Sequence, residues 1–229
     1  MSLFAIGDLH LSFSSEKPMD IFGDQWVDHP KRIERSWLEK IKADDTVLVP
    51  GDVSWGLKLQ EAMVDLEWLN NLPGRKILIK GNHDYWWKTI SKLNTLYDNM
   101  HFLQNNCYLY GEYAICGTRG WLCPNDSNFS QKDTKIYLRE LNRLELSLQQ
   151  AKKNGCDKII VMLHYPPTNE KKETSGFVDL LMQYQVKTVI YGHLHGKKYY
   201  DFGIQGERDG IQYYLTSSDY LNFEPLKIL

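Results

Sequence analysis

Short runs of β-branched and aliphatic residues recur along the chain, and each run stops at a small or polar residue. Such runs are typical of buried strands. Between them, apolar residues return every three or four positions, as they do on one face of a helix. Strands that alternate with helices favour parallel pairing. The predicted strands are 3–6, 46–49, 76–79, 158–163 and 188–191, and the helical stripes contain Ile33, Trp37 and Ile41, then Leu59, Met63, Leu66 and Leu69, then Phe177, Leu180, Leu181 and Tyr184.

The longest predicted helix covers about 133–154 and ends at Asn154-Gly155, a typical helix stop. Residues 107–110 and 113–116 flank a two-residue turn that begins with Gly111, which predicts an antiparallel hairpin. A turn at Gly210 followed by the apolar run 211–216 predicts further antiparallel strands in the tail. The pattern therefore predicts an α/β chain with a mixed second sheet. The least patterned segments are 11–29, 117–131 and 165–175, and we expect substrate contacts in such loops.

Composition and charge narrow the class of protein. The chain has 229 residues, 42% of them apolar, and no linker or repeat divides it, so we expect one domain over 1–229. Its formal net charge of −2 does not favour a nucleic-acid or anionic-membrane partner. No apolar stretch is long enough for a bilayer, and the first apolar run is too short for a signal peptide, so we expect a cytoplasmic protein. The four cysteines lack C-x-x-C spacing and are expected to be reduced thiols.

Polar side chains of metal-binding type follow all five predicted strands. Because the carboxyl ends of strands form the ligand crevice of an open α/β sheet, these side chains are expected to converge. Where two of them stand at i and i+2, an extended chain points both the same way. Five of the seven histidines fall in these blocks. In chain order the blocks contain Asp8 and His10; Gly51-Asp52; Gly81-Asn82-His83-Asp84; His164; and Gly192-His193-Leu194-His195.

Each block alone has a structural alternative. An Asp after a strand is often a solvated or capping residue, and we expect Asp84 to be the N-cap of the following helix. His193 and His195 have the alternative of surface positions on an edge strand. The conjunction of five blocks in this order favours a metal site over five separate structural roles.

The ordered blocks resemble the calcineurin-like metallophosphoesterase superfamily over positions 8–195. The resemblance implies a four-layer α/β/β/α sandwich of two mixed sheets. It also implies two metal ions that share Asp52 as a bridging ligand. The first ion would be held by Asp8, His10, Asp52 and His195, and the second by Asp52, Asn82, His164 and His193.

Carboxylate, amide and imidazole donors suit two divalent transition-metal ions, manganese, iron or zinc. Two such ions activate a bridging water and stabilise an in-line displacement at phosphorus. We therefore expect hydrolysis of a small phosphomonoester or phosphodiester by a metal-bridging hydroxide. Asp52 and His83 are the expected catalytic residues, His83 as the proton donor to the leaving oxygen.

The resemblance weakens after the second block. Ser/Thr protein phosphatases of this superfamily continue the Gly-Asp block into an Asp-Arg pair, whereas Val53 follows Asp52 here. Arg119 is a candidate for the missing phosphate contact, with a solvated loop position as its alternative. Four tryptophans near the motifs suit substrate stacking or core packing, and we expect at least two in the core: Trp55, Trp86, Trp87 and Trp121. Structural roles are expected for His29 and His101.

Two other functions compete with a small-molecule phosphoesterase. A nuclease would use the same metals, but the chain has no basic surplus. A non-catalytic interaction module would keep the metals only as structural links, but such modules lose ligands and none is missing here. The preference for monoesters or diesters, the metal and the oligomeric state stay open.

Overall fold

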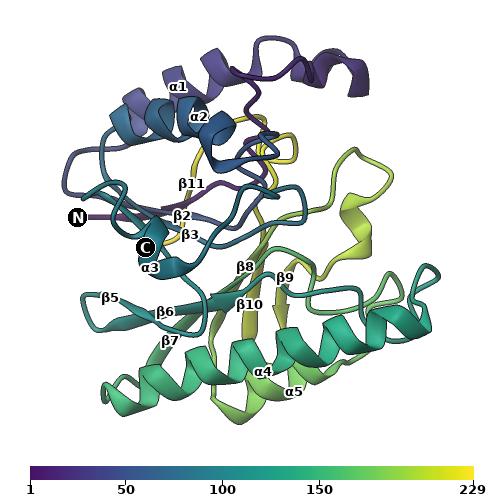
Figure 1. The fold of residues 1–229 in the computed structure, drawn as a ribbon. Helices are drawn as coiled ribbons and strands as arrows, with labels where there is room; N and C mark the ends of the chain where they lie inside the picture. Colours follow the sequence, from purple (N-terminus) through teal and green to yellow (C-terminus); the bar gives the residue numbers. More distant parts are fainter. The chain divides into compact units, whose positions relative to one another are not determined.

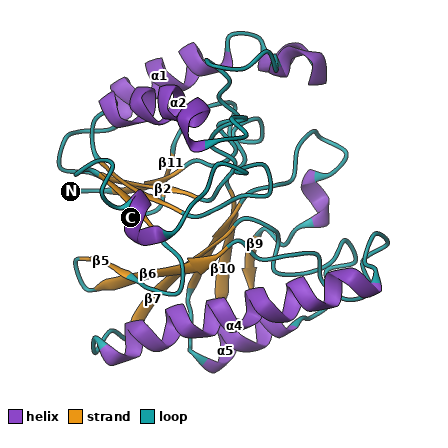
Figure 2. Ribbon diagram, in the orientation of Figure 1, coloured by secondary structure: helices purple, strands orange, loops and turns teal.

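The computed structural model describes residues 1–229. Packing divides the chain into two compact units, which we call the first unit, residues 1–102 and 216–229, and the second unit, residues 103–215. Each unit contains one mixed sheet with helices, drawn in Figures 1 and 2. The expectation of an α/β fold with two mixed sheets is confirmed. The expectation of one domain over 1–229 stays a prediction.

The first unit is built on a five-stranded sheet in the order β11-β1-β2-β3-β4. Strands β1 to β4 run parallel, and β11 is antiparallel to β1. The strands are β1 (Leu3–Ala5), β2 (Thr46–Val49), β3 (Arg75–Leu78), β4 (Met100–Phe102) and β11 (Leu226–Lys227). The helices are α1 (His29–Lys40), α2 (Leu59–Asn71) and α3 (Ile90–Leu93), with short 3-10 turns η1 (Met19–Phe22) and η2 (Asp24–Trp26).

Helices α1 and α2 cover the first sheet (Figure 1). The stripe predicted for α1 does enter the core, because Ile33 and Trp37 pack in the same buried cluster as Val47 and Val49 of β2. Leu66 and Leu69 of α2 join that cluster. Burying such side chains contributes roughly 1.5–3 kcal/mol each. The helices therefore hold β1, β2 and β3 in register, with their carboxyl ends at one edge.

The second unit is built on a six-stranded sheet in the order β5-β6-β7-β8-β10-β9. Strands β6, β7, β8 and β10 run parallel, while β5 and β9 are antiparallel edge strands. The strands are β5 (Tyr108–Tyr110), β6 (Tyr113–Thr118), β7 (Lys158–Leu163), β8 (Thr188–Tyr191), β9 (Gly206–Arg208) and β10 (Ile211–Leu215). The helices are α4 (Gln131–Lys153) and α5 (Gly176–Gln183), with one 3-10 turn, η3 (Tyr200–Phe202).

Helices α4 and α5 lie side by side over the second sheet (Figure 2). The predicted long helix is confirmed as α4, and its Leu144 and Leu148 pack against β6 and β7 residues. The predicted hairpin is confirmed as β5 and β6, with Gly111 at φ +54° in the turn. The tail differs in part, because β10 is antiparallel to β9 but pairs parallel with β8. All four cysteines are free thiols. None of the helices is long and apolar enough to cross a membrane.

Candidate metal centre

The first unit brings candidate ligands from three neighbouring strands to one edge of its sheet. Asp8 and His10 follow β1, Asp52 follows β2, and Asn82 follows β3. Asp8, His10 and Asp52 are almost fully buried. Carboxylate oxygens of Asp8 and Asp52 lie within 4.8 Å of each other, and a ring nitrogen of His10 lies within 4.8 Å of the Asp8 carboxylate. Nε2 of His10 is 3.9 Å from Oδ2 of Asp52. Two buried carboxylates and an imidazole thus face a common space.

The backbone at these ligands adopts a sparsely populated conformation. Asp8, His10 and Asp52 have φ angles of 55°, 46° and 51°, in the left-handed region. Such residues cost of order 1–3 kcal/mol each and persist only where the surroundings fix them. Here the N–H of Asp8 donates to the carbonyl of Gly51 at 2.9 Å, and that of His10 donates to the carbonyl of Asp52 at 3.0 Å. The two ligand loops therefore hold each other in the strained conformation.

Gly81 is required by the position of Asp52. A Cβ on Gly81 would lie 2.0 Å from Oδ1 of Asp52 and 2.3 Å from its backbone nitrogen, closer than real Cβ contacts come. The absence of a side chain lets the loop after β3 pass directly over the Asp52 carboxylate. As a result the N–H of His83 donates to Oδ1 of Asp52 at 2.8 Å. The glycine of the Gly-Asn-His-Asp block thus places the His83 segment against Asp52.

Asp84 does not cap a helix, so that prediction is wrong. The next helix, α3, begins six residues later, with Thr89 at its N-cap. The Asp84 side chain is instead fully buried, and its oxygens accept hydrogen bonds from the backbone of both ligand loops. Four donors lie at 2.8–3.0 Å: the backbone N–H groups of Asp52, Val53 and Gly81 and the indole Nε1 of Trp86.

These contacts make Asp84 the link between the loop after β2 and the loop after β3. Burial raises the pKa of the Asp84 carboxyl, and the backbone N–H donors act against that rise. Sequence reasoning missed this role because the pairing of Asp84 with Asp52 and Val53 joins residues more than thirty positions apart. The signal that was available was the acidic residue itself, two positions after a predicted ligand.

Aromatic side chains pack against the two histidines of the first unit. The Trp55 ring stacks on His10 with centroids 5.0 Å apart at 22°, and lies 4.3 Å from the His83 ring. Trp86 and Trp87 are buried in the core, so the expectation of two core tryptophans is confirmed. Trp55 is only half-buried, and its ring contacts both imidazoles.

The second unit brings its three candidate histidines to the carboxyl ends of adjacent strands. His164 follows β7, and His193 and His195 follow β8. His164 is fully buried, whereas His193 and His195 are partly exposed. The rings of His164 and His193 are 5.1 Å apart, and Tyr165 packs 4.0 Å from His193. His193 has a φ of 72°, so a fourth candidate ligand has left-handed backbone.

Arg119 lies in the second unit and is mostly buried, so the solvated alternative does not hold. Its side chain is 14% exposed, its guanidinium lies 3.5 Å from the fully buried carboxylate of Glu140, and it stacks over Trp121 at 4.4 Å. Its backbone carbonyl accepts hydrogen bonds from the N–H groups of His164 and Tyr165, both at 3.0 Å. Glu140 also accepts from Thr118 and Arg143, and sequence reasoning had not identified it.

His29 has the structural role expected for it. It is buried, and its ring nitrogens lie 3.1 Å from the carbonyl oxygens of Trp26 and Leu9. Burial lowers the pKa of His29. His101 lies on β4 in the first unit, outside the ligand loops. Neither residue adds a donor to the candidate site, so each unit contributes only the side chains that follow its strands.

Curated relatives match about a third of the chain, and a solved structure has a similar fold over the whole chain. The gene 66 protein of Mycobacterium phage L5 is 34% identical over 77 residues, covering 34% of this chain and 37% of that protein. The gene 66 protein of Mycobacterium phage D29 is 39% identical over 77 residues, covering 32% and 38%. The chain thus spans little more than a third of the length of these curated relatives.

The crystal structure of phosphopantetheinyl hydrolase (PptH) from Mycobacterium tuberculosis is similar over 100% of this chain and 95% of that chain, with a TM-score of 0.60 and 14% sequence identity. At this identity the likeness concerns the fold alone. The family model of calcineurin-like phosphoesterases matches residues 1–197. These residues include all the strand-end donors of both units. The chain belongs to the calcineurin-like phosphoesterase family.

Proposed function

We propose that the chain is a metal-dependent phosphoesterase that hydrolyses a small phosphate ester. The observation that carries the proposal is the pair of buried carboxylates, Asp8 and Asp52, with oxygens within 4.8 Å. Two carboxylates removed from water at this distance repel each other unless a proton or a cation lies between them. The neighbouring donors are imidazole and amide groups, which bind transition metals. The donor set therefore fits divalent cations.

The proposed ligand sets are those that the resemblance of the ordered sequence blocks implies. One ion would be held by Asp8, His10, Asp52 and His195, and the other by Asp52, Asn82, His164 and His193. Manganese, iron and zinc suit this mixture of oxygen and nitrogen donors, and no cysteine stands at a ligand position. Bound there, two such ions would supply the positive charge that binds a phosphate group and makes water nucleophilic at neutral pH.

His83 is the proposed proton donor to the leaving oxygen. Its backbone N–H is fixed on Asp52, and its ring is held by Trp55, so the imidazole has a defined orientation beside a proposed ligand. A positioned general acid contributes about 10²–10⁴ to the rate of such a reaction. The oxygen of the alcohol would leave with this proton while water supplies the new oxygen on phosphorus.

Arg119 stays a predicted phosphate contact, but its interactions favour a positioning role. The guanidinium is paired with Glu140, and this pairing fixes the segment whose carbonyl binds the N–H of His164. Removing one partner of a buried ion pair lowers the stability of the fold strongly, because the other charge is left buried and unpaired. We therefore propose that Arg119 acts mainly by orienting His164.

The test is an assay of the full chain after metal removal and reloading with manganese, iron, zinc or magnesium. The substrates are p-nitrophenyl phosphate and bis-p-nitrophenyl phosphate, which separate monoesterase from diesterase activity. We expect hydrolysis with at least one transition metal and none with a chelator present. Asp52→Asn should lower kcat/KM by about a thousandfold, because several kcal/mol of charge stabilisation is lost.

Asp20→Asn is the matched control, since Asp20 is an exposed carboxylate of the same unit. It should leave the rate unchanged. Full activity in Asp52→Asn would refute the assignment. A metal-loaded protein that hydrolyses neither ester would instead favour the non-catalytic module.

A further inference from the structure

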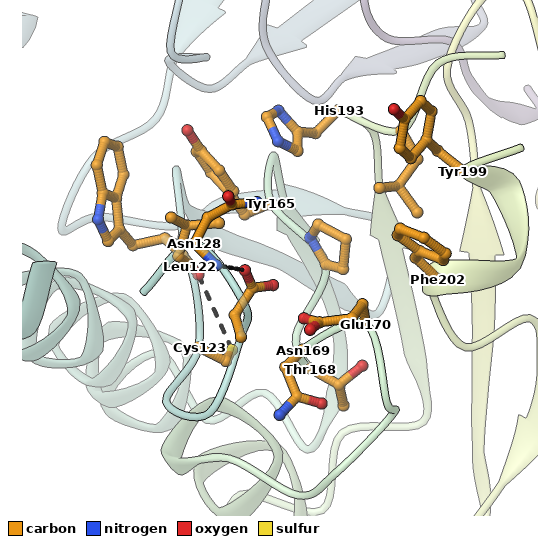
Figure 3. Close-up of a pocket in the computed structure, with 14 residues that line it drawn as sticks. Leu122, Cys123, Asn128, Tyr165, Thr168, Asn169, Glu170, His193, Tyr199 and Phe202 are labelled. Atoms are coloured by element: carbon orange, nitrogen blue, oxygen red, sulfur yellow. Dashed lines mark hydrogen bonds between the residues drawn. The ribbon is translucent and has the colours of Figure 1, made fainter. Parts of the chain in front are cut away.

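The second unit contains a cavity of about 170 Å³ next to His193. Aromatic side chains form much of its wall: Trp121, Tyr165, Tyr199 and Phe202. Figure 3 shows His193 and Tyr165 at one end, Glu170 near the middle, and Thr168 and Asn169 at the opposite end. The cavity thus leads from a proposed metal ligand into the interior of the second unit.

The two loops that form the cavity are joined by hydrogen bonds. The N–H of Ser127 donates to Oε1 of Glu170 at 2.9 Å, and Nδ2 of Asn169 donates to the carbonyl of Pro124 at 3.0 Å. The Asn169 side chain also bonds Glu173 at 2.7 Å, within its own loop. These contacts fix the two loops that form the wall of the cavity. A preformed cavity of this kind loses little conformational entropy when it binds.

The charged side chains of the wall, apart from His193, are two acids, Asp126 and Glu170. Burial, and then the neighbouring Glu170 carboxyl, raises the pKa of the Asp126 carboxyl, whereas the neighbouring Asp126 lowers the pKa of the Glu170 carboxyl. Glu170 therefore carries the negative charge of the pair. In the same wall the hydroxyl of Thr168, a residue only 5% exposed, has no hydrogen-bond partner within the protein. No lysine or arginine lines the cavity to bind an anion.

We propose that this cavity binds a compact ammonium group carried by the alcohol part of the phosphate ester. Aromatic walls attract a cation through their ring faces, and a carboxylate supplies the opposite charge. Ammonium binding by the cavity does not depend on the proposed function. Only the reaction rests on it, with the phosphate group at His193 and the amino alcohol in the cavity. The reaction is then hydrolysis: water forms the new P–O bond, the P–O bond to the amino alcohol breaks, and the alcohol leaves with a proton.

The size of the cavity excludes larger alcohols. Pockets for drug-sized ligands measure about 300–1,000 Å³, whereas an apolar cavity of about 150 Å³ holds a benzene-sized molecule. A space of about 170 Å³ therefore accepts a group such as choline or ethanolamine but not a nucleoside. Primary and quaternary ammonium groups share the chemistry, and the experiment separates them.

The binding experiment uses the full chain without added metal. Choline, ethanolamine and 3,3-dimethylbutan-1-ol are titrated by calorimetry, the last being an uncharged molecule with the shape of choline. We expect at least one of the two ammonium compounds to bind about tenfold more tightly than the uncharged alcohol, a difference of ~1.4 kcal/mol, because the aromatic faces and the carboxylate attract a cation but not an uncharged alcohol. Tighter binding of ethanolamine would show that the cavity recognises the N–H groups of a primary ammonium through hydrogen bonds. Tighter binding of choline would show that it recognises a quaternary ammonium through its aromatic faces.

The hydrolysis experiment compares phosphocholine and phosphoethanolamine with 3,3-dimethylbutyl phosphate on the metal-loaded chain. The kcat/KM of the preferred ammonium ester should exceed that of the uncharged ester by about tenfold. The double variant Asp126→Asn/Glu170→Gln should bring this ratio close to one, because neither acid can then supply the charge, while Gln keeps the Oε1 acceptor for Ser127. Asp201→Asn is the control, since Asp201 is an exposed acid beside Phe202 that does not line the cavity. It should leave the ratio unchanged.

Tyr199→Leu provides an independent variant if the double variant Asp126→Asn/Glu170→Gln does not fold. Tyr199 is 44% exposed, so its replacement has little effect on folding, yet it should lower the preference for choline. Equal binding of the uncharged alcohol and both ammonium compounds would overturn the inference, as would an equal effect of the double variant and Asp201→Asn on the ratio. Ammonium binding that is lost in the double variant, in a chain that hydrolyses no ester, would keep the cavity assignment and refute the proposed function.

Discussion

The two units present their candidate ligands in different ways. In the first unit the ligands include buried carboxylates on strained backbone, and Asp84 ties their loops together. In the second unit the ligands are imidazoles, two of them partly exposed, and a cavity adjoins one of them. Buried charges need fixed partners, whereas neutral imidazoles tolerate solvent. Under the proposed function, the first unit would therefore supply the rigid ligands and the second unit the contacts that select the substrate.

Asp84→Asn tests the rigidity of the first unit and should have the largest effect on stability. The amide would place an N–H donor against backbone N–H groups that now bind a carboxylate. We expect a loss of about 3–5 kcal/mol in the free energy of unfolding, measured by urea denaturation. Asp20→Asn, an exposed acid of the same unit, should stay within about 0.5 kcal/mol of wild type. Equal stability of the two variants would show that the loops do not depend on Asp84.

Lys76 tests how a buried charge of the first unit responds to pH. Its side chain is fully buried on β3, and Nζ donates to the carbonyls of Asn70 and Leu72 near the end of α2. Burial lowers its pKa from 10.5 to about 8. Between these pH values the unfolded chain keeps the proton and the folded chain loses it. The free energy of unfolding should therefore rise with pH across this range, by no more than about 3 kcal/mol.

The measurement compares wild type with Lys76→Met by urea denaturation at pH 7.5, 9 and 10.5. Methionine has a similar length and no charge, so the rise attributed to Lys76 should disappear. Subtracting the two curves removes the contributions of tyrosines that titrate in the same range. A difference between the curves that does not change with pH would contradict the role given to Lys76.

Trp55→Leu should have the smallest effect. The ring contacts both His10 and His83, and an aromatic pair is worth about 0.5–1.5 kcal/mol. We expect kcat/KM for p-nitrophenyl phosphate to fall by roughly tenfold and the acidic or basic limb of its pH profile to move, because the orientation of His83 changes. Tyr165→Leu, the corresponding change beside His193, makes the same comparison in the second unit. An unchanged pH profile in Trp55→Leu would show that the indole acts only in packing.

The sequence predicted the long, well-patterned elements of both sheets. The bounds of β2, β7 and β8 are the predicted ones, because their apolar runs are buried in parallel sheets. The elements it did not predict are β4, α3 and β11, which have only two to four residues each and are too short to show a period. The parallel pairing of β10 with β8 was also not predicted. The turn at Gly210 indicates only the antiparallel pairing of β10 with β9, and not the strand on the other side of β10.

The strand-end rule placed each candidate ligand at a sheet edge, because ligand and strand are adjacent in sequence. The role of Asp84 depends on hydrogen bonds to Asp52 and Val53, residues on another strand, and no local pattern contains that information. The same holds for Glu140, a buried acid on the long helix that pairs with Arg119. Contacts of this kind require the folded backbone, so the sequence indicates candidate ligands more readily than the residues that hold their loops in place.

The metal content of the purified chain tests the central claim most directly. After reloading and removal of free metal, mass spectrometry of the metal should give about two transition-metal ions per chain. Changing one ligand from either unit, Asp8→Ala or His164→Ala, should lower that number, whereas Asp20→Asn should not. A wild-type chain that retains no metal, or a metal content that His164→Ala leaves unchanged, would contradict the account.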